Sequence, residues 1–151
     1  MTRSYKEVIN EMNRAYNEFY ILLSQELKDE FGLTGQQESM IFYINLNKNT
    51  TANNIATTFN ISKSAVSQVL SKLEKHNMIS KQVNPNNKRE YFLTLGPNGS
   101  NYIERLSQLD DLLIEKYFSK IDIEALQQMT DTLIKINKII LEEKKKTLEP
   151  K

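Results

Sequence analysis

The stretch between residues 51 and 99 constrains the fold most, because its hydrophobic period changes from 3.6 residues to 2 partway along. Thr51 and Ser62 are favourable N-cap residues, and each precedes apolar residues at helical spacing. They predict a short helix and, after a tight link, a second helix over residues 62–76. The second helix has a single apolar stripe, so one of its faces is expected to be buried: Val66, Val69, Leu70 and Leu73.

The period of 2 begins after Asn77, a residue type that often ends a helix in the left-handed conformation. Apolar residues then alternate with polar ones around residues 79–83 and again around residues 91–95, which predicts two β-strands. The segment between them, residues 84–88, is dense in turn-forming residues and predicts a hairpin with a basic tip. A helix-turn-helix followed by a β-hairpin is the order of elements in a winged helix.

The free face of the second helix carries short hydrogen-bonding side chains and two cations: Lys63, Ser64, Ser67, Gln68, Ser71 and Lys72. Such side chains suit the floor of the DNA major groove, where each base pair presents a distinct pattern of donors and acceptors. The hairpin tip adds Lys88 and Arg89, and the narrow, strongly negative minor groove attracts cations. The segment therefore predicts a surface that binds double-stranded DNA.

The charges of the chain are unevenly distributed. The formal net charge is only +1, yet residues 62–94 contain six cations and two anions, a net of +4. A basic lobe on an otherwise acidic chain is an electrostatic footprint for phosphate, and an ordinary solvated face is the alternative interpretation. Four lysines are expected to neutralise phosphates: Lys72, Lys75, Lys81 and Lys88.

Helices are also predicted on both sides of this segment. Ser4 with Glu7, and Thr34 with Gln37, have the spacing of capping boxes at the starts of two helices. A long helix is expected after residues 96–99, and the last helix has an apolar seam as narrow as that of a coiled coil. Because the chain has only four Gly and three Pro, the predicted fold class is mostly α, with one two-stranded β-wing.

The chain resembles the MarR family of bacterial transcription regulators in the order and length of these elements. The resemblance is most specific at residues 60–79, which are similar to the family's recognition helix and its exit, and at residues 84–89, which are similar to its wing. It implies a homodimer with a dimerisation base (residues 1–32 and 100–146), a winged helix (residues 33–99) and a tail (residues 147–151). It also implies a palindromic operator, usually repression, and often release by a small amphipathic ligand.

Carried over residue by residue, the resemblance implies DNA-backbone contacts from Ser62, Ser71 and Lys72, and insertion of Arg89 into the minor groove. The wing departs from the family pattern at Asn87, where an aspartate usually pairs with an arginine, and at Lys81, a poorer bidentate partner than arginine at the position after the helix exit. Residues 95–99 also lack the threonine that usually follows the leucine. These departures imply a looser wing. The resemblance assigns major-groove contacts to four residues of the recognition helix: Lys63, Ser64, Ser67 and Gln68.

An effector pocket is a further expectation. Five aromatic side chains of the first two helices could line a pocket for a small amphipathic or aromatic effector, although a place in the core is the commoner use of such residues. They are Tyr16, Phe19, Tyr20, Phe42 and Tyr43.

Other chemistries find little support in the sequence. The chain has no Cys, and its one histidine, His76, has no cluster of ligands around it, so neither a metal nor a cofactor is expected. The helix serines have no base beside them, so no enzyme is expected. No apolar run is long enough for a membrane span or a signal peptide, so the expected location is cytoplasmic. The alternative function is a winged-helix dimer that binds small molecules or proteins without specific DNA binding.

Overall fold

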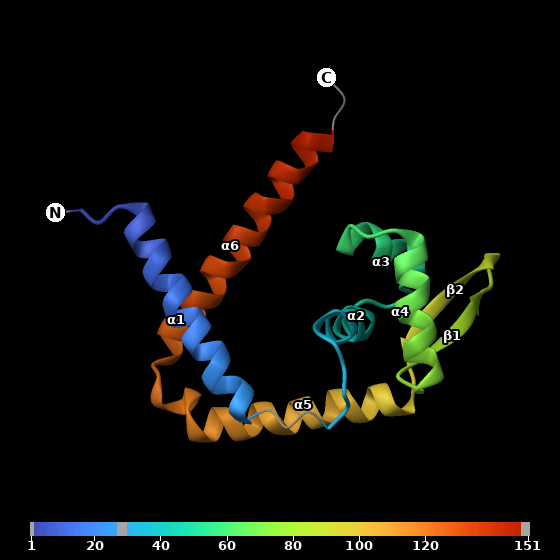
Figure 1. Ribbon diagram of the computed structural model, residues 1–151, viewed down its shortest axis with the longest axis horizontal. Helices are drawn as coiled ribbons and strands as arrows, with labels where there is room; N and C mark the ends of the chain where they lie inside the picture. The colour runs from blue at the N-terminus through green and yellow to red at the C-terminus, as the bar shows by residue number, and fades with distance from the viewer. Residues whose placement is uncertain (1, 27–29, 149–151) are drawn as a thin grey trace. The chain divides into compact units, whose positions relative to one another are not determined.

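The computed structural model describes residues 2–26 and 30–148 (Figure 1). Two compact units divide the chain, residues 1–99 and residues 100–151. The described part of the first unit contains α1 (Tyr5–Glu26), α2 (Gly35–Leu46), α3 (Ala52–Phe59), α4 (Lys63–Lys75), β1 (Ile79–Asn84) and β2 (Asn87–Leu95). Helix α5 (Pro97–Lys116) crosses the boundary, and the described part of the second unit continues with η1 (Phe118–Lys120) and α6 (Ile123–Leu148). The predicted fold class, mostly α with one two-stranded wing, is confirmed.

The predicted helix starts are set by local side-chain caps. The Thr34 hydroxyl accepts a hydrogen bond from the Gln37 backbone at 3.2 Å, and the Gln37 side chain accepts one from the Thr34 backbone at 2.9 Å. Thr51 forms a second box of this kind with Asn54. These caps satisfy backbone N–H groups that a helix start would otherwise leave unpaired.

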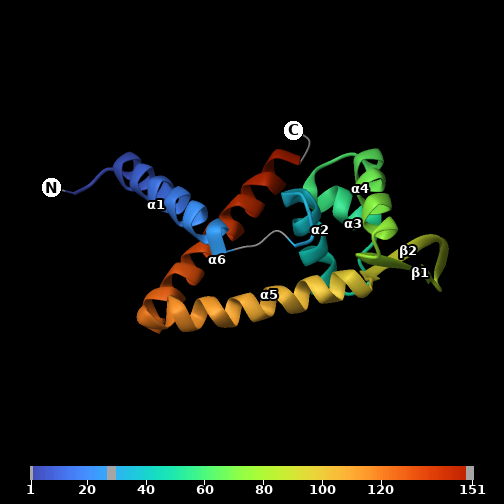
Figure 2. The same ribbon diagram turned by 60° about the horizontal axis from the view of Figure 1, so that its bottom comes forward.

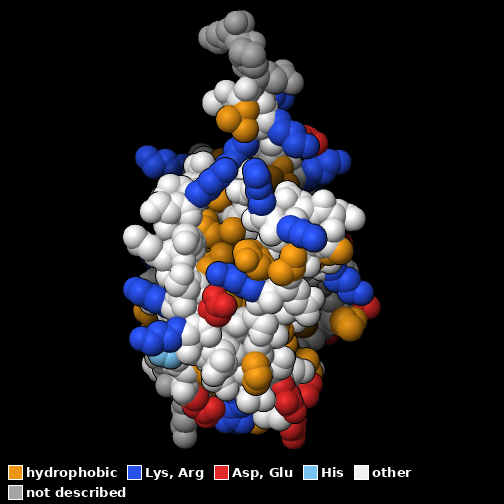
Figure 3. All heavy atoms as spheres, turned by 90° about the vertical axis from the view of Figure 1, so that its right-hand side faces the viewer, with side chains coloured by type: hydrophobic (Ala, Val, Ile, Leu, Met, Phe, Trp, Pro, Cys, Tyr) orange, Lys and Arg blue, Asp and Glu red, His pale blue; other side chains and the backbone are white. Residues whose placement is uncertain are grey.

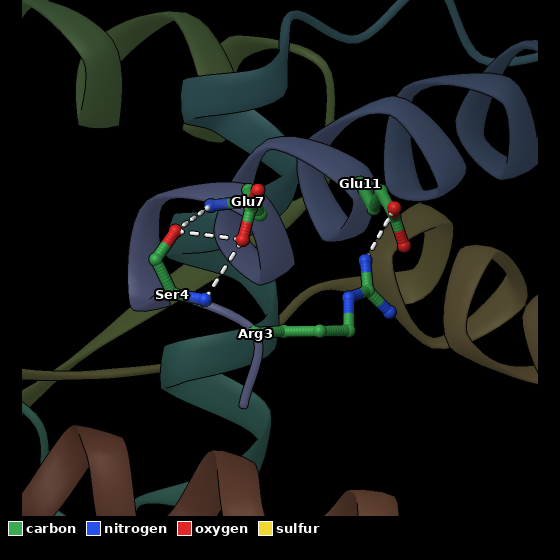
Figure 4. Close-up of polar contacts among 4 residues, drawn as sticks. All are labelled: Arg3, Ser4, Glu7 and Glu11. Carbon is green, nitrogen blue, oxygen red and sulfur yellow. Dashed lines mark hydrogen bonds and ion pairs between the residues drawn. The ribbon is translucent and has the colours of Figure 1, made fainter. Parts of the chain in front are cut away.

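The capping box at the start of α1 is also confirmed (Figure 4). The backbone N–H of Ser4 donates to the Glu7 carboxylate at 2.8 Å, the Ser4 hydroxyl donates to the same oxygen at 2.9 Å, and the Glu7 N–H donates back to that hydroxyl at 3.3 Å. The hydrogen bond from the Ser4 backbone, followed by the one from its hydroxyl, lowers the pKa of Glu7. Arg3 forms an ion pair with Glu11 one turn further on.

The core of the first unit lies among α2, α3, α4 and the hairpin. Ten apolar side chains with little or no exposure form it: Met40, Ile41, Ile44, Ile55, Val66, Leu70, Leu73, Met78, Ile79 and Leu93. Thr50, in the link between α2 and α3, accepts a hydrogen bond from the Leu93 backbone at 2.7 Å and so ties that link to β2. The helix-turn-helix and the hairpin therefore share one core.

Two element boundaries differ from the prediction. The hairpin turn is only Pro85-Asn86, and β2 begins at Asn87, because the Asn84 side chain accepts a hydrogen bond from the Asn86 backbone at 2.9 Å and reverses the chain within two residues. Helix α5 begins at Pro97 and not after Gly99, because proline fits the first helical position, where no N–H is needed.

The first turn of α5 docks on the turn between α4 and β1, where Asn77 is left-handed with φ of 56°. The Gly96 N–H donates to Met78 O at 2.9 Å, and the Asn98 N–H donates to Asn77 O at 3.0 Å. The Asn98 side chain also donates to the carbonyl of His76 at 2.8 Å. Carbonyls at the exit of α4 are thereby satisfied by the next helix.

Helices α1 and α6 each carry exposed apolar side chains at helical spacing. In α1 these include Ile9, Met12 and Phe19, and in α6 they include Leu133, Ile136 and Ile140. Apolar stripes of this length are rarely left in water. The predicted tail begins at residue 147, but α6 extends to Leu148, and residues 149–151 lie outside the described residues.

Candidate nucleic-acid interface

Helix α4 buries one face and exposes the residues predicted to contact DNA. Ser62 is its N-cap and accepts a hydrogen bond from the Ala65 backbone at 3.1 Å. Val66, Leu70 and Leu73 are buried, whereas the predicted contact residues are all exposed: Ser62, Lys63, Ser64, Ser67, Gln68, Ser71 and Lys72. The 3.6-residue period that fixes the buried stripe also fixes this exposed face.

The exposed residues of α4 point in three directions. At about 100° per residue, the side chains opposite the core span an arc of only about 60°, and we call them the crest of α4: Ser64, Gln68, Ser71 and Lys75. Lys63 and Ser67 lie on one flank of the crest and Lys72 on the other, with Ser67 and Lys72 about 140° apart. The crest can therefore face one groove while the flanks face its two edges.

The wing is a hairpin that extends beyond the helices in both ribbon views (Figures 1 and 2). Its register pairs Val83 with Tyr91 and then Asn84 with Asn87, so the segment from Lys88 to Glu90 is a bulge in β2. Bulges re-aim side chains that would otherwise alternate across the sheet. The bulge contains Lys88 and Arg89, both exposed, at the tip of the wing.

Hydrogen bonds of two asparagine side chains hold the wing tip together. The Asn84 side chain, in a residue that is 8% exposed, donates to the Glu90 carboxylate at 3.1 Å. The Asn87 side chain accepts a hydrogen bond from the Arg89 backbone at 3.2 Å. The two asparagines thus supply contacts inside the wing, although Asn87 stands where the family pattern has an aspartate.

A cavity of about 390 Å³ lies between the wing and α4, and its lining includes Ser67 and Arg89. Ala52 and Asn53, at the N-terminus of α3, line it as well. The sequence predicts Thr51 as a helix N-cap. It does not predict that the start of α3 lies beside the wing, because that proximity depends on tertiary packing. Lys and Arg side chains are spread over this side of the molecule (Figure 3).

The Lys81 side chain contacts two other side chains of the protein. Its ammonium group lies 3.0 Å from the carboxylate of Glu74, in the last turn of α4, and 5.9 Å from the centre of the Tyr91 ring. Its charge is therefore partly offset by Glu74 before any phosphate approaches. The sequence alone favoured Lys81 as a phosphate ligand, because nothing local connects it with Glu74.

Lys72 lies beside a second cavity, of about 500 Å³, on the other flank of α4. Its lining includes His76 together with Phe31, Leu33 and Met78. The cavity thus combines two basic side chains with apolar walls.

The five aromatic residues suggested for an effector pocket have different surroundings. Tyr16, Phe19 and Tyr20 lie on α1 with exposed rings, and Phe42 on α2 is also exposed. Tyr43 packs edge-on against Phe59 with ring centres 5.9 Å apart, and its hydroxyl accepts a hydrogen bond from Thr58 at 3.2 Å. Tyr43 therefore contacts two residues of α3.

Within residues 2–26 and 30–148, no three His, Cys, Asp or Glu side chains are grouped so that they could hold a metal ion. Over the same part of the chain, no helix combines the length and the apolar character needed to cross a membrane.

The sequence is similar to those of known proteins with a helix-turn-helix. The sequence model of the MarR family matches residues 33–91. The uncharacterised HTH-type transcriptional regulator YvnA of Bacillus subtilis is 33% identical over 107 residues, covering 69% of this chain and 67% of YvnA. The chain belongs to the MarR family. As a MarR-family protein it is a DNA-binding transcriptional regulator.

Solved structures of MarR-family proteins share the fold. FabT of Streptococcus pneumoniae, crystallised with DNA, superposes with a TM-score of 0.73 at 13% identity over 92% of this chain and 99% of that one. MepR of S. aureus bound to ethidium bromide superposes with a TM-score of 0.59 at 21% identity over 91% of this chain and 97% of that one.

Proposed function

We propose that this MarR-family protein is a homodimer that binds palindromic operators in double-stranded DNA and represses transcription. The observation that carries the proposal is the geometry of α4 and the wing. The polar crest of α4 is free of the core, and the bulge beside it offers Lys88 and Arg89. In this arrangement Arg89 enters the minor groove, Lys88 neutralises phosphates, and Ser62, Ser71 and Lys72 contact the DNA backbone. The residues that read base edges in the major groove are Lys63, Ser64, Ser67 and Gln68.

The dimer is supported by the apolar side chains of α1 and α6. Leu133, Ile136 and Ile140 repeat at three- and four-residue steps on α6, and 40–56% of each is exposed. A second copy of the chain would cover such a seam in the manner of a coiled coil. Two winged helices related by a two-fold axis would then read half-sites about 34 Å apart.

Relief of repression by a small aromatic or amphipathic molecule is a further part of the proposal. It is supported by the structure of MepR, a protein of the same fold, with ethidium bromide bound. Direct titration of the protein with ethidium in the absence of DNA, followed by fluorescence, tests this part, because ethidium also binds duplex DNA. No change in fluorescence at millimolar protein would exclude ethidium-like effectors.

Selection of bound duplexes from a random pool tests the central proposal. Recovery of a palindrome with half-site centres one helical turn apart supports it and identifies the operator. Retention of random duplex at low salt without enrichment of any sequence would contradict specific binding. The absence of any retention would favour a winged-helix dimer that binds small molecules or proteins instead. The proposal includes no enzymatic activity.

A further inference from the structure

We propose that Glu74, Lys81 and Tyr91 form a clasp that sets the position of the wing relative to α4, and that Lys81 serves DNA binding through this clasp and not as a phosphate ligand. The inference rests on the proposed function, in which α4 and the wing enter neighbouring grooves. The three residues come from α4, β1 and β2, so the clasp joins all three elements of the interface.

The clasp lies where the hairpin leaves the core. Ile79, Lys81 and Val83 share one face of β1, and the register places Leu93 opposite Lys81 and Tyr91 opposite Val83 on the same face. Ile79 and Leu93 are 2% and 3% exposed, whereas Val83 and Tyr91 are 54% and 47% exposed. Lys81 is therefore the last inward-facing position of β1 at which α4 can hold the hairpin.

The contacts at this position run across both strands. Glu74 in α4 holds the Lys81 ammonium group at 3.0 Å, with the two side chains 45% and 35% exposed respectively. Lys81 and Tyr91 are diagonal neighbours on one sheet face, and the ammonium group lies 5.9 Å from the ring centre, within cation–π range. Beyond these contacts the inward face of the hairpin has only exposed side chains.

The choice of residue at position 74 supports a positioning role. A carboxylate in the last turn of a helix lies at the negative end of the helix dipole, which is unfavourable. A carboxylate close to DNA phosphates is unfavourable as well. Glu74 therefore neither stabilises α4 as an isolated helix nor attracts DNA, and its carboxylate is instead paired with Lys81.

The position of the wing matters because the residues proposed to contact the two grooves lie on different elements, α4 and the wing. Ser67 on α4 and Arg89 on the wing line the same cavity, and Lys81 and Tyr91 line it between them. A change in the angle of the hairpin would move Arg89 relative to the crest of α4. Both could then no longer fit neighbouring grooves of one duplex at the same time.

Three proteins of equal net charge test the clasp: the wild type, the Glu74→Gln/Lys81→Gln double variant, and the Glu74→Lys/Lys81→Glu exchange. Their affinities for the selected operator are measured by fluorescence anisotropy at several salt concentrations. We expect the glutamine variant to bind about two- to five-fold more weakly, the range open to a half-exposed ion pair. We expect the exchange variant to return to within about two-fold of wild type, with an unchanged salt slope, because it restores the ion pair.

Two outcomes would overturn the inference. If the exchange variant binds more weakly than the glutamine variant and its salt slope falls by about one, Lys81 is a phosphate ligand. If all three proteins bind the operator with equal affinity, the clasp does not position the wing for DNA binding.

Amide hydrogen exchange, measured on the proteins without DNA, tests the clasp independently of the proposed function. The clasp predicts faster exchange along β1 and β2 in the glutamine variant than in the wild type or the exchange variant. If the wild type binds no duplex at all, the proposed function fails, and these exchange rates alone decide whether the clasp holds the wing. Equal rates in all three proteins would refute it.

Discussion

The close packing of Gly99 against the exit of α4 makes Gly99→Ala a sharp test of how α5 is joined to the winged helix. A Cβ atom at position 99 would lie 2.0 Å from the carbonyl oxygen of Met78 and 3.1 Å from its carbonyl carbon. That oxygen already accepts the hydrogen bond from Gly96 N–H at 2.9 Å. Because the obstructing atoms are backbone, no side-chain rotation can relieve the contact, and the first turn of α5 must move.

The size of the effect follows from three contributions. Forcing extra volume into a packed site costs about 1–3 kcal/mol. Weakening the Gly96–Met78 hydrogen bond costs about 1 kcal/mol more. The stiffer backbone of alanine in the unfolded chain returns about 0.4–1 kcal/mol. We therefore expect Gly99→Ala to lower the free energy of unfolding by about 1–3 kcal/mol, with a fall in Tm of about 2–4 °C for each kcal/mol.

Gly35→Ala is the matched control. Gly35 also lies in the first turn of a helix, but a Cβ atom there would meet nothing within 4 Å. Neither glycine has a positive φ, so alanine changes the unfolded chain similarly in both. Urea unfolding at one fixed protein concentration, which holds the contribution of dimerisation constant, should show Gly35→Ala to be neutral or slightly stabilised. The packing argument would be refuted if Gly99→Ala were as stable as Gly35→Ala.

Three other predictions follow from the interface, the apolar seam and the capping box. Arg89→Ala should weaken operator binding and reduce the salt slope by about one, whereas Arg89→Lys should keep the slope; an unchanged affinity and slope in the alanine variant would remove the wing from the DNA-binding mechanism. Leu133→Glu should shift the protein from dimer to monomer in sedimentation equilibrium, while Gln128→Glu, about 140° around α6 from Leu133, should not; two dimeric variants would contradict the proposed seam. The Glu7 carboxyl should titrate below its ordinary value of 4.5 by NMR and move only partway back in Ser4→Ala, because the larger cause, the backbone N–H, remains. Since this pKa is lowered in the folded chain, the stabilisation of the α1 start is present above the unfolded pKa and is lost as pH falls through the folded one.

The helices of this chain could be predicted because their signals are local. The caps at Ser4, Thr34, Thr51 and Ser62 each act within three residues, and the structure contains all four. The crest of α4 was predictable for the same reason, since a period of 3.6 that places Val66, Leu70 and Leu73 in the core determines what remains outside.

The wing was harder to predict because its details depend on contacts between residues apart in the chain. The alternation of apolar residues indicated two strands but not the bulge that shifts the register after Val83. The ion pair of Glu74 and Lys81 could not be predicted either, because the two residues belong to different elements and meet only when the hairpin packs on α4. Sequence patterning therefore located the exposed face of α4 better than it described how the wing is held.

Different forces hold the wing tip and its base, and this difference bears on how salt affects DNA binding. At the tip, the Asn84 and Asn87 side chains bond to nearby groups, so the shape of the tip depends little on screening. At the base, the half-exposed pair of Glu74 and Lys81 is open to screening by salt. Rising salt should therefore act twice, by weakening phosphate contacts and by loosening the hold of α4 on the wing. The glutamine variant lacks the second effect, so its loss of affinity relative to wild type should shrink as salt increases.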